Sequence, residues 1–125
     1  MGGTRILLAD DYDGWRVRIR ELLQFRPEWR IVFEARDGLE AVEKAAELQP
    51  NVVLLDLEMP NLNGIEAARR ILQACPDSRI IFLSQNIDSD VMLAALATGA
   101  KAYVRKESAS QELLSVIEAV IRDSA

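Results

Sequence analysis

The chain has 125 residues, of which half are apolar and 28% are charged, and its net charge is −5. This length and composition are typical of one soluble globular domain, and no apolar run reaches the roughly 18 residues that a transmembrane helix needs. The acidic balance disfavours direct binding to nucleic acid or to an anionic membrane. Because no signal-peptide pattern follows Met1, we expect a cytoplasmic protein.

The chain contains one cysteine, Cys75, and no histidine. These counts exclude an internal disulfide, a Cys/His zinc site and any Ser-His or Cys-His catalytic pair. We expect Cys75 and Met59 to pack in or near the core. The chemistry of the chain must therefore use carboxylates, hydroxyls or lysines.

Apolar runs of strand length alternate along the chain with segments of helical periodicity. The runs predict five strands, at residues 5–10, 30–35, 52–57, 79–84 and 101–106. Their hydrophobicity is continuous rather than alternating. This pattern indicates strands that are covered on both faces, as in a parallel sheet between two helix layers.

Helical periodicity fills the segments that follow these strands, and Gly99 stands where a helix C-terminus favours a left-handed residue. The predicted apolar stripes are Trp15, Ile19, Leu22 and Leu23; Leu39, Val42 and Ala46; Ile65, Ala68, Leu72 and Cys75; and Leu113, Leu114, Ile117, Val120 and Ile121. Four crossovers of helix length join the five strands. The sequence therefore predicts an α/β, (βα)5 doubly wound fold in a single domain over residues 1–125.

Polar side chains stand at the carboxyl ends of four predicted strands, where ligands bind in open α/β sheets. They are Asp10 and Asp11, Asp56, Ser84 and Lys106. Clustered carboxylates repel one another, and a cation relieves that repulsion. A small number of hard oxygen ligands favours Mg²⁺ over a transition metal. A lysine at such a site is best explained as the partner of an anion that also binds the metal, with phosphate as the obvious candidate.

Each of these residues also has an ordinary structural explanation. The acids of residues 10–13 could cap the helix that follows them, Ser84 could end a strand in a turn, and Lys106 could be a solvated surface lysine. Asp56 is harder to explain in this way. A carboxylate that closes an apolar strand must be solvated, paired or metal-bound, because burying it alone is prohibitive.

Four segments of the chain resemble the receiver domain of two-component response regulators, over essentially the whole length. The segments are LLADD, LLDLEMPNLNG, IIFLS and GAKAYVRK. In order and spacing they supply an acidic pair, an aspartate followed by MP and glycine, a hydroxyl, and an aromatic residue with a lysine. The resemblance implies a flavodoxin-like parallel sheet of strand order 2-1-3-4-5, with the first and third strands side by side.

The resemblance also implies a role for each site residue. Asp56 would be the nucleophile that accepts a phosphoryl group from a phosphohistidine on a sensor histidine kinase. Asp11 would bind Mg²⁺ directly beside Asp56, Asp10 would bind it chiefly through water, and the backbone carbonyl of Glu58 would supply a further oxygen. Lys106 would pair with a phosphoryl oxygen, so that catalysis is mainly positioning and electrostatics.

The resemblance further implies a switch. Ser84 would hydrogen-bond another phosphoryl oxygen, and its movement would leave space for Tyr103, which could also simply pack under a helix. The surface formed by the fourth helix, the fifth strand and the last helix would then change, and a homodimer could form there. We expect a phosphoacceptor switch rather than an enzyme, one that phosphorylates itself from small phosphodonors and also dephosphorylates itself.

The run LAALATGAKAYVRKES resembles LuxR-type response regulators, whose receivers precede a helix-turn-helix DNA-binding domain. We therefore expect a transcriptional output, with DNA bound only by an effector domain that is missing from this chain. One alternative is a stand-alone receiver that acts through protein contacts. An alternative of another class is a small Mg²⁺-dependent aspartyl phosphatase of the haloacid dehalogenase type, although those enzymes carry a second aspartate where this chain has Glu58.

Some positions depart from the commonest receiver pattern or invite a further hypothesis. Glu107 follows the predicted lysine where many receivers have proline, so a cis-proline turn is absent. Gln85 follows the predicted hydroxyl where a small residue is frequent, and we hypothesise that its bulk alters access of water and the lifetime of the phosphoryl group. Arg16, Arg18 and Arg20 could contact a kinase, although such charges are more often a solvated face.

Overall fold

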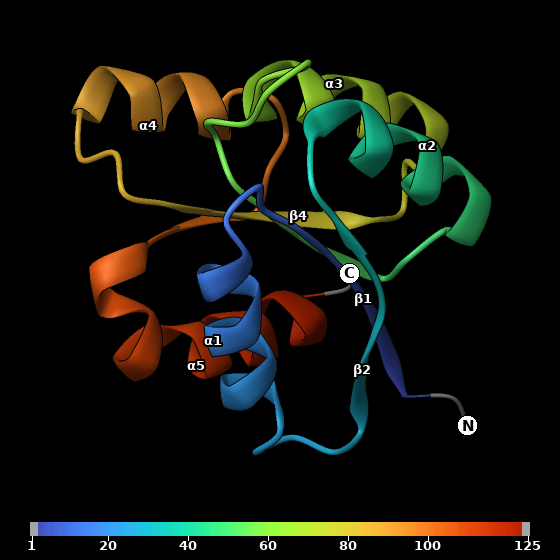
Figure 1. Ribbon diagram of the computed structural model, residues 1–125, viewed down its shortest axis with the longest axis vertical. Helices are drawn as coiled ribbons and strands as arrows, with labels where there is room; N and C mark the ends of the chain where they lie inside the picture. The colour runs from blue at the N-terminus through green and yellow to red at the C-terminus, as the bar shows by residue number, and fades with distance from the viewer. Residues whose placement is uncertain (1–2, 124–125) are drawn as a thin grey trace.

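Five parallel strands form one sheet in the order β2-β1-β3-β4-β5, with helices on both faces (Figure 1). The computed structural model describes residues 3–123, so the predicted domain of residues 1–125 extends beyond the described part at both ends. The predicted fold class and strand order are confirmed. In chain order the elements are β1 (Thr4–Ala9), α1 (Asp13–Leu23), β2 (Trp29–Ala35), α2 (Gly38–Leu48), β3 (Val52–Leu55), α3 (Gly64–Ala74), β4 (Arg79–Ser84), α4 (Ser89–Leu96), β5 (Ala102–Arg105), the 3₁₀ helix η1 (Lys106–Ser108) and α5 (Ala109–Arg122).

The order of the strands reverses between β1 and β3, which pair directly. Their register runs from Ile6 opposite Val52 to Ala9 opposite Leu55, so the two strands end level with each other. In an open parallel sheet this switch point leaves a crevice beyond the carboxyl ends of the strands. The residues that follow β1 and β3 are therefore brought side by side.

The apolar strand residues divide between two cores, one on each face of the sheet. Leu7 and Leu55 belong to the core under α2, α3 and α4, and Ile6, Leu8 and Leu54 belong to the core over α1 and α5. Figure 1 shows these two helix layers on opposite sides of the sheet. The continuous hydrophobicity of the strands thus has the predicted cause, because alternate side chains are buried on both faces.

The buried face of α2 differs from the predicted stripe. Leu39 is 49% exposed and Ala46 is also exposed, whereas Ala41 and Ala45 are fully buried and Val42 is half-buried. α2 contacts α3 and the sheet through these small residues. Close approach of the helix leaves no room for a leucine on its inner face, so the bulky side chain lies at the rim.

The predicted strands around the switch point were one or two residues too long at their carboxyl ends. β1 stops before Asp10, β3 stops before Asp56, and Lys106 begins η1 rather than ending β5. Backbone bonding nevertheless continues past the strands. The Asp10 N–H donates to the Ala35 carbonyl at 3.1 Å and the Asp56 N–H donates to the Ala9 carbonyl at 3.0 Å. The two acids are therefore held by the neighbouring strands.

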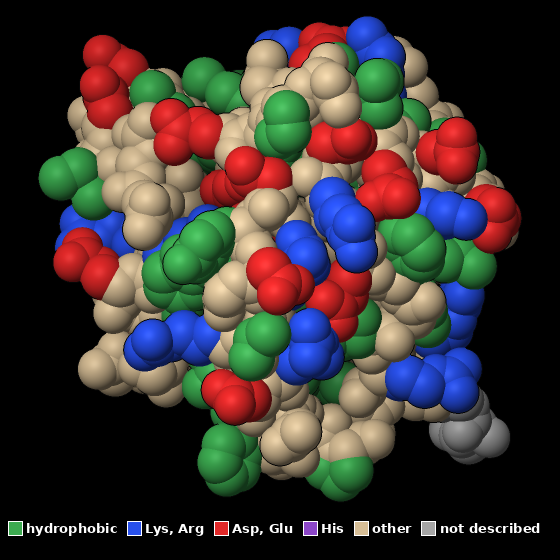
Figure 2. Space-filling view, in the orientation of Figure 1, with side chains coloured by type: hydrophobic (Ala, Val, Ile, Leu, Met, Phe, Trp, Pro, Cys, Tyr) green, Lys and Arg blue, Asp and Glu red, His purple; other side chains and the backbone are tan. Residues whose placement is uncertain are grey.

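Other local expectations are met. Met59 and Cys75 are buried, and Gly99, which follows α4, has a φ of +106°, a left-handed conformation that favours glycine. Within residues 3–123, no helix combines the length and apolarity required for a membrane span. Figure 2 shows acidic and basic side chains interspersed over one face of the molecule, with apolar side chains scattered among them.

Candidate functional site

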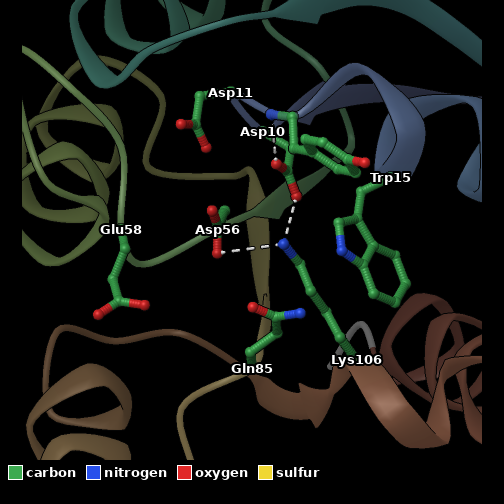
Figure 3. Close-up of a pocket in the computed structure, with 8 residues that line it drawn as sticks. Asp10, Asp11, Trp15, Asp56, Glu58, Gln85 and Lys106 are labelled. Carbon is green, nitrogen blue, oxygen red and sulfur yellow. Dashed lines mark hydrogen bonds and ion pairs between the residues drawn. The ribbon is translucent and has the colours of Figure 1, made fainter.

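Three carboxylates meet beyond the ends of β1 and β3. Asp10, Asp11 and Asp56 each place one oxygen within 4.8 Å of the others (Figure 3). Asp10 and Asp56 are buried, at 3% and 6% exposure, while Asp11 is exposed. The sequence predicted this convergence, and the switch point between β1 and β3 produces it.

Lys106 reaches this cluster from the far side of β4. Its Nζ lies 2.7 Å from Asp10 Oδ2 and 3.6 Å from Asp56 Oδ1, and its side chain is 5% exposed (Figure 3). A solvated surface lysine is therefore the wrong description of Lys106. Its ammonium group lies between two buried acids and offsets part of their charge.

One lysine does not offset the charge of three acids. Burial and then the neighbouring Asp10 raise the pKa of Asp56 to about 7, and Asp11 adds to this effect, whereas Lys106 opposes it. The ionised form of Asp56 is thus disfavoured unless further positive charge is present. A divalent cation would supply it, and the closely spaced oxygens are the hard ligands that Mg²⁺ takes. The acidic cluster therefore fits a metal.

The acidic pair does not cap α1 through its side chains. The N-cap of this helix is Tyr12, whose side chain makes no capping bond, and Asp10 Oδ1 instead accepts the Tyr12 N–H at 2.9 Å. Asp13 is the first residue of the helix and pairs with Arg16 at 2.7 Å. The ordinary explanation offered for these acids thus does not apply to Asp10 or Asp11.

The acids line a hollow of about 430 Å³ that opens to solvent. Tyr12 and Trp15 are the aromatic residues that line it. Figure 3 shows Trp15 and Glu58 on opposite sides of the acids. The complete set of lining residues is Asp10, Asp11, Tyr12, Trp15, Asp56, Glu58, Gln85 and Lys106. The hollow is thus polar at its base and has a partly aromatic wall.

The loop that carries Glu58 is held against β3 by Gly64. A Cβ at this position would lie 2.1 Å from the Asp56 carbonyl oxygen and 2.7 Å from Leu57 Cα. The Gly64 N–H donates to the Leu57 carbonyl at 2.6 Å. Glycine is therefore required for the close backbone approach that sets the position of Asp56.

Ser84 and Tyr103 share a hydrogen-bond partner, Asn86. Ser84 is fully buried, and its Oγ accepts the Asn86 N–H at 3.1 Å. Tyr103 is half-buried, its ring lies 6.3 Å from that of Phe82, and its hydroxyl donates to the Asn86 carbonyl at 2.8 Å. Tyr103 thus packs in the sheet and also contacts the loop after β4.

A second hollow of about 380 Å³ adjoins the first and contains Ser84. Trp15, Gln85 and Lys106 line both hollows. These three residues therefore lie at the boundary between the two hollows. The Lys106–Glu107 bond is trans, as expected for a chain without proline at this position, since residues 3–123 contain no cis peptide bond.

Arg16 is a site residue that sequence reasoning placed wrongly. It is buried, and its guanidinium donates to the Asp10 carbonyl and to Asp13 Oδ1, each at 2.7 Å. It cannot belong to an exposed docking face, whereas Arg18 is exposed and Arg20 pairs with Glu34. The spacing of Asp13 and Arg16, three residues apart on a helix, was the available signal.

Trp15 is the second residue that sequence reasoning did not assign to the site. The apolar pattern predicted it as part of the core-facing stripe, and the ring does pack against the core over α1 and α5. Its other surroundings are the two hollows and the ammonium group of Lys106, which lies 5.0 Å from the ring centroid. A stripe pattern alone does not reveal that second contact.

Comparison with known families accounts for this arrangement. Residues 6–118 match the model of the response regulator receiver domain. The chain belongs to this family. Receivers of two-component systems are signalling switches, and the relatives of this chain include LuxR-family response regulators, as the resemblance predicted.

Two relatives and one solved structure illustrate the similarity. The receiver is 37% identical over 115 residues to the transcriptional regulatory protein LiaR of Bacillus subtilis strain 168, which covers 92% of this chain and 54% of LiaR. It is 40% identical over 111 residues to the protein-glutamate methylesterase/protein-glutamine glutaminase of Thermotoga maritima. The aligned region covers 87% of this chain and 32% of that relative. The crystal structure of a LuxR-family response regulator from Aurantimonas sp. SI85-9A1 superposes with a TM-score of 0.91 at 37% identity, covering 97% of this chain and 86% of that one. The receiver thus spans about half the length of LiaR.

Proposed function

We propose that this receiver accepts a phosphoryl group on Asp56 from a phosphohistidine of a sensor histidine kinase. One observation carries the proposal: Asp56 lies within 4.8 Å of two further acids while Lys106 contacts it from the other side. A buried nucleophile flanked by a cation site and a fixed ammonium group suits transfer of a doubly charged group. Membership in the receiver family supports the same assignment.

A carboxylate oxygen of Asp56 attacks phosphorus, and a bond forms between them while the P–N bond of the phosphohistidine breaks. The electron pair of the P–N bond stays with the imidazole nitrogen, which is protonated from solvent. The product is an acyl phosphate on Asp56, and attack by water later returns the carboxylate and releases inorganic phosphate.

Residues of this chain would offset the negative charge of the phosphoryl group, either through a bound cation or directly. Asp10, Asp11, Asp56 and the Glu58 carbonyl would hold Mg²⁺, which when bound neutralises phosphoryl oxygens and so lowers the cost of their approach to the acids. Lys106 Nζ, which lies 3.6 Å from Asp56 Oδ1, would pair with one phosphoryl oxygen. The buried Ser84 hydroxyl, which lines the adjoining hollow, would donate to another.

Switching would start at the Ser84 hydroxyl. If the Ser84 side chain moved toward a phosphoryl oxygen in order to donate to it, the hydrogen bond that its Oγ accepts from the Asn86 N–H would lengthen or break. Tyr103 bonds the carbonyl of the same residue, so the loop between β4 and α4 and the position of Tyr103 would adjust together. The surface of α4, β5 and α5 would carry this change to a partner or to a second copy of the receiver.

Transcription is the output that the relatives favour. LiaR is named a transcriptional regulatory protein, and the receiver spans about half of it. The proposal is therefore a cytoplasmic receiver whose DNA contacts are made by an effector domain outside the 125 residues of this chain. The methylesterase relative shows that a similar receiver also occurs in an enzyme, so a stand-alone or differently coupled receiver is the second candidate. An aspartyl phosphatase is not retained, because the family match is to a receiver.

The test is the intact mass of the protein after incubation with acetyl phosphate, with and without Mg²⁺. Wild type and Asp56→Asn are compared, because asparagine keeps the shape of the side chain and removes the nucleophile. We expect a Mg²⁺-dependent gain of one phosphoryl group that hydroxylamine removes and that the variant lacks. The same experiment on Asp11→Asn tests the assigned metal ligand, for which we expect a higher Mg²⁺ requirement.

Failure of wild type to gain mass, with folded protein and Mg²⁺ present, would count against the proposal. Such a receiver would signal by binding alone. A gain that persists in Asp56→Asn would place the phosphoryl group on another residue. Sustained turnover of a phosphate ester, rather than one phosphoryl group per chain, would instead indicate an enzyme.

A further inference from the structure

Lys106 has three close neighbours, and one of them is aromatic. Its Nζ lies 2.7 Å from Asp10 Oδ2, 3.6 Å from Asp56 Oδ1 and 5.0 Å from the centroid of the Trp15 ring. Figure 3 shows the indole beside the lysine side chain, on the side away from Asp56. The ammonium group thus lies between two acids and an aromatic face, at a distance typical of a cation–π pair.

The two acids cannot keep Lys106 throughout the proposed reaction. Asp10 and Asp56 belong to the acidic cluster that fits a metal, and Asp56 is also the proposed acceptor. Once these carboxylates share their charge with a divalent cation, their attraction for the ammonium group falls. If these two acids held it by themselves, a lysine side chain with four rotatable bonds would then lose its fixed position.

Trp15 supplies an attraction that does not compete with the reacting groups. An aromatic face attracts an ammonium group and offers no oxygen to a metal. The ring itself is fixed, because Trp15 is the third residue of α1 and packs against the core over α1 and α5. It also lines both hollows, as Lys106 does.

We propose that Trp15 is a positioning residue for Lys106, whose ammonium group it keeps at the boundary between the two hollows when Asp10 and Asp56 are engaged elsewhere. This inference rests on the proposed role of Lys106 in pairing with the phosphoryl group. Trp15 acts through the lysine and does not itself touch the reacting atoms. A fixed ammonium group speeds transfer because it need not be ordered at the moment of reaction.

The test is the rate at which acetyl phosphate phosphorylates wild type, Trp15→Phe and Trp15→Leu at one fixed Mg²⁺ concentration. Leucine keeps an apolar side chain and lacks the aromatic face, whereas phenylalanine keeps the face. We expect Trp15→Leu to react roughly 2- to 30-fold more slowly, the range that corresponds to a cation–π pair. We expect Trp15→Phe to recover most of that loss.

A double-mutant cycle separates positioning from a general structural effect. In the Lys106→Met background, Trp15→Leu should cause no further loss of rate, because there is no ammonium group left to position. The matched control background is Arg18→Gln, since the Arg18 guanidinium lies 5.5 Å from the same ring on the exposed surface of α1. There the loss caused by Trp15→Leu should persist in full.

A fluorescence measurement keeps Trp15 intact and so does not depend on how its variants fold. The chain has two tryptophans, and Trp29→Phe leaves Trp15 as the single emitter. Trp29 begins β2, at the opposite end of the strands, so this change leaves the site alone. We expect Lys106→Met, introduced into this single-tryptophan protein, to shift the emission of Trp15.

Any of three results would overturn the inference. The first is an equal phosphorylation rate for Trp15→Leu and wild type, and the second is an equal loss of rate on Trp15→Leu with and without Lys106. The third is a Trp15 emission spectrum that Lys106→Met leaves unchanged. Each is read only against a wild type that does become phosphorylated. A wild type that gains no phosphoryl group would instead refute the proposed function, so the two failures are distinguishable.

Discussion

Ser84 and Tyr103 bind the two backbone groups of a single residue, Asn86. The Ser84 hydroxyl accepts the Asn86 N–H at 3.1 Å, and the Tyr103 hydroxyl donates to the Asn86 carbonyl at 2.8 Å. The two side chains come from neighbouring strands, β4 and β5. Asn86, in the loop before α4, thus links the two side chains.

Replacement of Ser84 by alanine should loosen this loop. Because the Asn86 N–H would lose its acceptor, we expect faster amide hydrogen exchange in residues 85–91 of the unphosphorylated receiver. The free energy of unfolding should fall by about 1 kcal/mol, the net value of one hydrogen bond. Hydrogen–deuterium exchange followed by mass spectrometry measures the first effect and urea unfolding measures the second.

Ser78→Ala is the matched control, because Ser78 is also a buried serine and its hydroxyl donates to the Pro50 carbonyl before the start of β4. Loss of this hydrogen bond should lower the free energy of unfolding by a comparable amount without affecting amide hydrogen exchange in residues 85–91. Unchanged exchange in the Ser84 variant would contradict the role assigned to the Asn86 contact.

Gly64→Ala should displace the nucleophile. The new Cβ would lie 2.1 Å from the Asp56 carbonyl oxygen, and backbone atoms cannot yield as a flexible side chain can. We expect a loss of about 1–3 kcal/mol in stability, as for other overpacked sites, and weaker Mg²⁺ binding because Asp56 moves. Urea unfolding and Mg²⁺ titration of tryptophan fluorescence measure these effects.

Gly14→Ala provides the comparison for that prediction. Its Cβ would meet the Tyr12 ring at 2.6 Å, but this ring is 64% exposed and can rotate away. In a helix, alanine is favoured over glycine by roughly 0.5–1 kcal/mol, so stability should be unchanged or slightly higher. Equal losses for both glycine variants would show that the contact with the Asp56 carbonyl is not what matters.

Much of the site was predictable because it depends on topology rather than on side-chain detail. Continuous apolar runs indicated a doubly covered parallel sheet, and the strand ends of such a sheet necessarily place Asp10, Asp11 and Asp56 at one edge. The error of one or two residues in strand length does not matter for this conclusion. Backbone bonds to the neighbouring strands hold Asp10 and Asp56 in place even outside the strands themselves.

The features that sequence reasoning missed depend on how closely elements approach one another. Leu39 was predicted to face the core, but α2 packs through small residues and leaves it exposed. Arg16 was treated as a surface charge, yet the carbonyl of Asp10 and the carboxylate of Asp13 make its burial possible. The pattern of charged and apolar residues in a sequence does not indicate how closely a neighbouring backbone segment approaches a side chain.

Gln85 should slow hydrolysis of the acyl phosphate. Its exposed side chain lines both hollows, one of which contains Asp56, and its bulk would hinder the approach of water from that side. We expect Gln85→Ala to lose its phosphoryl group several-fold faster than wild type. The measurement is the decay of the phosphorylated mass after removal of the phosphodonor. Ile87→Ala is the control, because Ile87 lines the second hollow and not the hollow that contains Asp56. Equal decay rates for wild type and Gln85→Ala would discard the hypothesis.

The metal-free receiver should become less stable as the pH rises, because of Asp56. Burial and the charge of Asp10 raise the pKa of this carboxyl from 3.8 to about 7 in the folded protein. The folded state therefore holds a proton that the unfolded state releases near pH 4. The stability that this proton contributes is complete below pH 4 and is lost as the pH rises through about 7, by at most about 4 kcal/mol.

Urea unfolding of wild type and Asp56→Asn from pH 4 to pH 8, with a chelator present, measures this contribution. Asparagine does not titrate, and the other acids titrate in both proteins, so the difference between the two unfolding free energies isolates Asp56. We expect the unfolding free energy of Asp56→Asn to increase relative to that of wild type as the pH rises. The difference between the two values should level off above about pH 7. Since Mg²⁺ and the proton compete for the same carboxylate, Mg²⁺ should bind wild type more tightly at pH 8 than at pH 6. A difference that stays constant with pH would show that Asp56 ionises at its ordinary pKa, and that the charge of the cluster is already balanced without a metal.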